Sequence, residues 1–129
     1  MTTELRMLGW SVFLGLAYVL IAAGLVTRQR GIRWNAGNRE GETQPLTGVA
    51  GRAARASGNF LETFPFFAAA ILAITVTKHA TSHTALGAEF YFWARLVYLP
   101  VYLAGIPYVR TAVWAVSLWG LLQVLEGLF

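Results

Sequence analysis

Four polar residues with the chemistry to bind a small molecule share a regular spacing within an otherwise apolar segment. Arg52, Arg55, Asn59 and Glu62 follow one another at intervals of three, four and three residues. Side chains three or four residues apart meet on one face of an α-helix, so the spacing predicts a polar stripe along a single helix. Guanidinium groups bind carboxylates through paired hydrogen bonds, and the amide and the carboxylate would bind the other polar groups of a ligand.

The next apolar segment carries a second stripe, in which tyrosines accompany an arginine. Tyr91, Arg95, Tyr98 and Tyr102 are spaced four, three and four residues apart. A charged side chain at membrane depth costs at least about 2.5–3.5 kcal/mol unless it is paired or hydrated. Two arrangements would offset this free-energy cost. One is an ion pair between Glu62 and Arg95 that fixes the helix register, and the other is a site for an anionic, amide-rich ligand. The number of polar groups favours the ligand site.

Four long apolar segments would position the two stripes. Hydrophobic residues make up 57% of the 129-residue chain and charged residues 12%, whereas soluble domains average about 45–50% and about 25%. Crossing a bilayer core of about 30 Å takes about 20 helical residues. We therefore predict an all-α membrane protein, a four-transmembrane-helix bundle that forms one domain over residues 1–129. The predicted helices cover Met7–Val26, Ala50–Thr77, Thr84–Gly105 and Tyr108–Leu128.

Positive charge is concentrated in the polar segment Thr27–Val49, which we expect to be a loop with little regular structure. Its arginines are Arg28, Arg30, Arg33 and Arg39, whereas the connection between the second and third helices offers only Lys78. The positive-inside rule then places loop 27–49 in the cytoplasm and both termini on the opposite side. Because topology accounts for the net charge of +4, we expect no nucleic-acid partner.

Other classes of site find little support in the sequence. The chain has no cysteine, which excludes disulfides, thiolate metal sites and a cysteine nucleophile. His79 and His83 are four residues apart, but no further ligand types cluster near them, so we expect no metal site.

Two ordered blocks resemble the signatures of one membrane-protein family. The run from Arg52 to Pro65, RAARASGNFLETFP, resembles the R-A-x-x-N-x-x-E-x-x-P signature of the MAPEG family, the membrane-associated proteins in eicosanoid and glutathione metabolism. The block from Phe92 to Tyr102, continued through Pro107 and Arg110, resembles the helix-three pattern of that family. The resemblance extends over the whole chain, with four helices, a long basic first loop and a short third turn.

The resemblance implies more than the spacing alone. It implies a homotrimer of four-helix protomers, with glutathione between neighbouring subunits on the cytoplasmic side. The compact chain resembles the bacterial branch, which implies a bacterial inner membrane. Arg110 would stabilise the glutathione thiolate and so take the catalytic role, whereas Thr63 stands where some glutathione-using members have a ligand-contacting tyrosine. The residues that match glutathione-contacting positions are Arg52, Arg55, Asn59, Glu62, Arg95, Tyr98 and Tyr102.

Two functions follow from the resemblance. One is a glutathione transferase or peroxidase that acts on lipophilic small molecules entering from the lipid bilayer. The alternative is a non-enzymatic protein of the same fold that binds lipid or serves as a subunit of a larger membrane complex, because the family includes a non-catalytic, lipid-presenting member. A transporter is disfavoured, since 129 residues show no inverted repeat.

Overall fold

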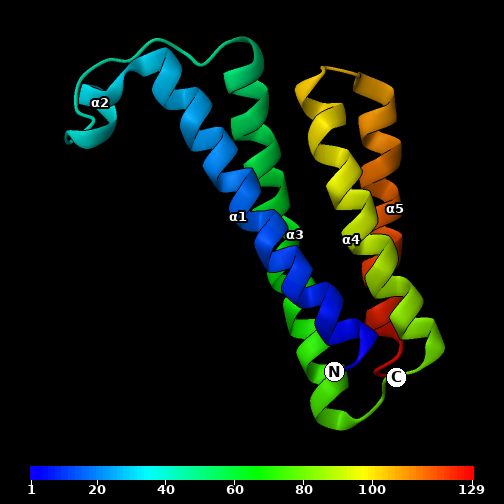
Figure 1. Cartoon of the computed structure of the whole chain (residues 1–129). Coiled ribbons are helices and arrows are strands. Elements are labelled where there is room, and N and C mark those ends of the chain that lie inside the picture. Colours follow the sequence, from blue (N-terminus) through cyan, green and yellow to red (C-terminus); the bar gives the residue numbers. More distant parts are fainter.

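A computed structural model describes all 129 residues, from Met1 to Phe129. The chain is all-α (Figure 1), as the sequence predicts. Its four long helices lie side by side, and a short helix lies in the first loop. The helices are α1 (Thr3–Arg30), α2 (Ile32–Ala36), α3 (Gly48–Thr77), α4 (Ser82–Leu103) and α5 (Pro107–Glu126).

Three of the long helices, α1, α3 and α5, have the length and composition to cross a membrane. The fourth, α4, has 22 residues, which corresponds to about 33 Å at 1.5 Å per residue. Its hydropathy is lowered by Glu89 and Arg95, which lie within the helix. The ends of α3, α4 and α5 lie within two residues of the predicted ends.

The first loop differs from the prediction. The first helix continues to Arg30 rather than ending at Val26, and α2 follows it directly, so the expectation of little regular structure is wrong for this part of the loop. Arg28 and Arg30 lie in the last turn of α1, where positive charge interacts favourably with the helix dipole. Gly31 then ends the helix with a φ of 98°, which costs a residue without a Cβ little.

The long helices form two antiparallel pairs. As Figure 1 shows, α1 lies along α3 and α4 lies along α5, and the pairs diverge toward the end that carries the first loop and the α4–α5 turn. Gly87 and Gly120 bring α4 and α5 together, since a Cβ on Gly120 would lie 2.6 Å from the Gly87 carbonyl oxygen. Small residues allow membrane helices to approach closely in this way.

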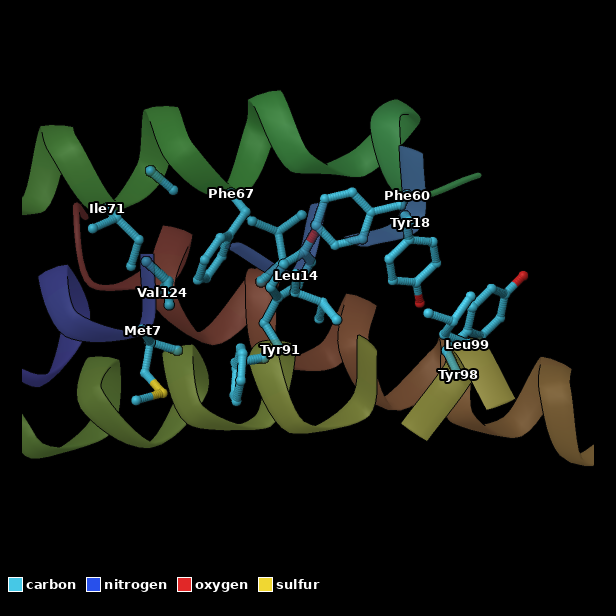
Figure 2. Packing of buried hydrophobic residues seen from close by; sticks show 14 of the residues in the cluster. Met7, Leu14, Tyr18, Phe60, Phe67, Ile71, Tyr91, Tyr98, Leu99 and Val124 are labelled. Carbon is cyan, nitrogen blue, oxygen red and sulfur yellow. The ribbon is translucent and has the colours of Figure 1, made fainter. Parts of the chain in front are cut away.

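Aromatic side chains form much of the buried core between the helices (Figure 2). Tyr18 of α1 stacks on Phe60 of α3 at 4.7 Å between ring centroids, and Phe67 of α3 stacks on Tyr91 of α4 at 3.9 Å. A buried polar contact joins α1 to α4 near the termini, where Thr84 Oγ1 donates to Glu4 Oε2 at 2.8 Å. The core therefore holds both helix pairs together and fixes the register of the polar stripes.

Candidate functional site

An arginine-rich pocket lies between the start of α3 and the α4–α5 turn. It has a volume of about 200 Å³. Arg52 Nε donates to the Leu103 carbonyl oxygen at 3.0 Å, and Arg55 Nε donates to the Tyr102 hydroxyl at 3.2 Å. The Arg110 guanidinium carbon lies 4.7 Å from the centre of the Tyr102 ring. The lining residues are Arg52, Arg55, Tyr102, Gly105, Ile106, Pro107 and Arg110.

The α4–α5 turn brings Arg110 to this pocket. Gly105 has a φ of 77°, a left-handed conformation that favours glycine. Pro107 is the first residue of α5, a position where its missing N–H leaves no helical hydrogen bond unmade. Arg110 therefore lies one turn into α5, opposite the arginines of α3.

A smaller second pocket lies next to the first, with Arg110 in the wall of both. It has a volume of about 130 Å³ and is lined by Asn59, Tyr98, Arg110, Thr111 and Trp114. The indole Nε1 of Trp114 is buried and has no hydrogen-bond partner. Because tryptophans in membrane proteins commonly serve as interfacial anchors, Trp114 did not stand out in the sequence. Its spacing of four residues from Arg110 is the signal that places both on one face of α5.

Arg95 is wholly buried behind this pocket, with none of its side chain exposed. Its Nη1 donates to Asn59 Oδ1 at 2.8 Å, while Nε and Nη2 have no partner. The predicted ion pair between Glu62 and Arg95 is therefore wrong. Successive helical residues turn by about 100°, so Glu62 is rotated about 60° from Asn59, the residue that contacts Arg95.

Glu62 instead lies at the edge of an apolar groove between α3 and α5, and its side chain is exposed. The groove has a volume of about 650 Å³. Apart from Glu62 and Thr63, its lining is hydrophobic: Phe66, Ala69, Ala70, Ala73, Leu118, Leu121, Leu122, Leu125 and Leu128. Polar pockets and an apolar groove thus follow one another along the same two helices.

The comparison with protein families agrees with this architecture. The model of the MAPEG family matches residues 7–125. The chain belongs to the MAPEG family. Neither the search of curated proteins nor that of solved structures gives a match. As a MAPEG protein with several helices long and apolar enough to span a bilayer, the chain is a multi-pass integral membrane protein.

One residue that supports the two polar stripes, Tyr18, was not singled out by the sequence. Tyr18 of α1 donates its hydroxyl to the carbonyl oxygen of Arg95 at 2.5 Å. Thr63 and Tyr91 form a hydrogen bond of 3.1 Å between their hydroxyls, which keeps Tyr91 in the core rather than at a pocket. No signal in the sequence pointed to Tyr18, because the apolar α1 shows no polar stripe.

Proposed function

We propose that the protein binds glutathione at the two polar pockets and joins it through its sulfur to lipophilic electrophiles. The observation that carries this proposal is the position of Arg110, which lies in the wall of both the arginine-rich pocket and the pocket beside Asn59. Arg52 and Arg55 border the first pocket from α3, and their guanidinium groups suit the two carboxylates of the tripeptide. Family membership supports glutathione as the ligand.

Arg110 is the residue proposed to activate the sulfur. A free cysteine thiol has a pKa of about 8.5, and a neighbouring guanidinium lowers that value by stabilising the thiolate. The thiolate sulfur would attack an electrophilic carbon and form the carbon–sulfur bond, while the leaving group departs with the bonding electron pair. Tyr98, which lines the second pocket with Arg110, is the residue proposed to donate a hydrogen bond to the sulfur.

The groove between α3 and α5 is proposed to hold the apolar part of the electrophile. It opens at Glu62 and Thr63 and continues along the leucines of α5, so a lipophilic molecule would lie with its reactive end toward the polar pockets. Hydrophobic lining with a few polar groups at one end is typical of sites for amphiphilic ligands. The size of this groove also favours the alternative function, in which the protein binds lipid without chemistry.

The proposed functional unit is a homotrimer of single-domain protomers that each span residues 1–129. Glu62 is exposed on a membrane-spanning helix and has no ion-pair partner. Exposure of a charged side chain to lipid is unfavourable by at least about 2.5–3.5 kcal/mol. A neighbouring copy with glutathione at the shared boundary would cover this carboxylate, and the ligand's ammonium group would pair with it.

Thiolate formation on the purified protein tests the function. Glutathione added to the protein in detergent is expected to produce thiolate absorbance in the ultraviolet, and an aryl halide should be conjugated. Arg110→Ala should abolish the thiolate signal, whereas Arg6→Ala, at an exposed position in the first turns of α1, should leave it unchanged. Absence of glutathione binding at millimolar concentration would overturn the proposal, and lipid binding without turnover would establish the alternative.

A further inference from the structure

Arg95 and Asn59 form the one direct hydrogen bond between the buried guanidinium and a polar side chain. Arg95 is wholly buried and has no carboxylate partner, and its Nη1 lies 2.8 Å from Asn59 Oδ1. Three aromatic rings surround its guanidinium carbon, which lies 5.8 Å from the centre of Tyr18, 5.2 Å from Phe60 and 4.5 Å from Tyr98. The positive charge of Arg95 is therefore stabilised by the faces of aromatic rings and by the amide oxygen of Asn59.

Chemistry fixes which way the Asn59 amide points. A guanidinium carries only hydrogen-bond donors, so the atom that faces Arg95 must be the amide oxygen of Asn59. The amide nitrogen then points away from Arg95. It makes no hydrogen bond within the protein and is not among the buried, unpartnered polar atoms. Asn59 borders the pocket that it shares with Arg110, so its free N–H groups are available to a ligand there.

We infer that Arg95 is a positioning residue that holds Asn59 as a fixed hydrogen-bond donor to the ligand, so that this point of the pocket binds only an oxygen acceptor such as a carboxylate or peptide carbonyl. This inference rests on the proposed glutathione site and changes the role of Arg95 within it. Arg95 donates to Asn59, and Asn59 donates to the ligand. Hydrogen bonds in such a chain strengthen one another, and the buried charge polarises the amide toward donation.

The backbone of Arg95 is held in place by a tyrosine of α1. The Tyr18 hydroxyl donates to the Arg95 carbonyl oxygen at 2.5 Å, and the Tyr18 ring stacks on Phe60, one residue beyond Asn59. Figure 2 shows Tyr18 and Phe60 adjacent at this level of the core. α1 thus fixes the relative position of the two helices that carry Arg95 and Asn59. A rigid support of this kind keeps the donor in one orientation before the ligand binds.

Asn59→Asp tests the orientation directly, because it replaces the amide nitrogen by a second acceptor oxygen at nearly the same size. A carboxylate beside Arg95 supplies the missing counter-ion, so the melting temperature in detergent should rise. Glutathione binding should weaken at least about tenfold, since a donor to the ligand becomes a repelling acceptor. Asn59→Leu, the control, should lower the melting temperature because Arg95 then has no partner. A lower melting temperature for Asn59→Asp, or unchanged glutathione affinity, would overturn the inference.

Substitutions of Arg95 separate positioning from packing. Arg95→Lys keeps a donor-only group and should retain most of the glutathione affinity, whereas Arg95→Met keeps the length of the side chain but releases the amide and should weaken binding about tenfold. Equal affinities in the two variants would overturn the positioning role. If Arg95→Met does not fold, the glutathione affinities of Arg95→Lys and Asn59→Asp test the positioning role instead. Failure of the wild-type protein to bind glutathione would overturn the proposed function, while the melting temperatures of the Asn59 variants would still test the contact with Arg95.

Discussion

The arginines of the candidate site use their guanidinium groups in three different ways. Arg52 donates to a backbone carbonyl at the end of α4, Arg55 donates to the Tyr102 hydroxyl, and Arg110 lies over the Tyr102 ring. Only Nε of Arg52 and of Arg55 takes part in these bonds. The terminal nitrogens of both residues are therefore free to bind carboxylates in the paired geometry that a guanidinium favours.

The Tyr102→Phe variant tests whether Arg55 must be anchored to bind the ligand. Loss of the hydroxyl removes the acceptor for Arg55 Nε. The exposed side chain of Arg55 can then adopt other rotamers. A hydrogen bond of this kind contributes about 1 kcal/mol, so the Kd for glutathione should rise roughly fivefold. Isothermal titration calorimetry would measure the change.

Tyr91→Phe is the matched control, because it removes a hydroxyl that bonds to Thr63 in the core and not at a pocket. Its Kd should equal that of the wild-type protein. Equal effects of the two substitutions would show that Arg55 does not depend on Tyr102.

The sequence predicted most of the residues that line the two polar pockets, but not how they pair. Spacing by three and four residues places Arg55 and Asn59 near one helix face, and both border pockets. Over the ten residues from Arg52 to Glu62, however, an α-helix at 3.6 residues per turn leaves the two side chains about 80° apart. That drift turns Glu62 toward the apolar groove. The partner of Arg95 depends on the relative position of two helices, and the spacing of residues within one helix does not determine that position.

At the scale of the helices, a close approach between two glycines holds α4 and α5 together. Gly87 and Gly120 face each other, and a Cβ on either would lie within 2.7 Å of the other's carbonyl oxygen. The first loop and the pairing of α1 with α3 do not contribute to this contact. The apolar pattern of the sequence predicted both helices, but the glycines gave no signal because they follow no repeated small-residue motif.

Gly120→Ala is therefore expected to destabilise the α4–α5 pair. The added methyl group would also lie 2.7 Å from the Tyr91 amide nitrogen, so both backbones must move apart. Overpacking of this kind typically costs about 1–3 kcal/mol, and the melting temperature in detergent should fall. Gly24→Ala on α1, where a Cβ meets no atom within 4 Å, should not lower it, because alanine without a clash favours a helix over glycine. Equal melting temperatures for both variants would show that α4 and α5 tolerate a wider separation.

At the scale of the whole molecule, positive charge and the polar pockets lie at the same end. The first loop and the α4–α5 turn both lie where the helix pairs diverge (Figure 1), and the arginine-rich pocket borders that turn. The termini and the α3–α4 connection lie at the other end, where Thr84 binds Glu4. A water-soluble thiol would therefore reach the pockets from one side of the membrane only.

The side from which the pockets open is a testable consequence of the charge distribution. The loop 27–49 contains four arginines, whereas the α3–α4 connection contains only Lys78, so the positive-inside rule predicts a cytoplasmic loop. Because the chain has no cysteine, single cysteines report their own accessibility. With an impermeant maleimide, His79→Cys should react in intact cells and Glu42→Cys only after permeabilisation. Both side chains are exposed, and the α3–α4 connection and the first loop that contain them lie at opposite ends of the molecule (Figure 1). Ala88→Cys, wholly buried, should stay unlabelled in both. The reverse pattern would place the polar pockets on the outer side of the membrane and contradict this orientation.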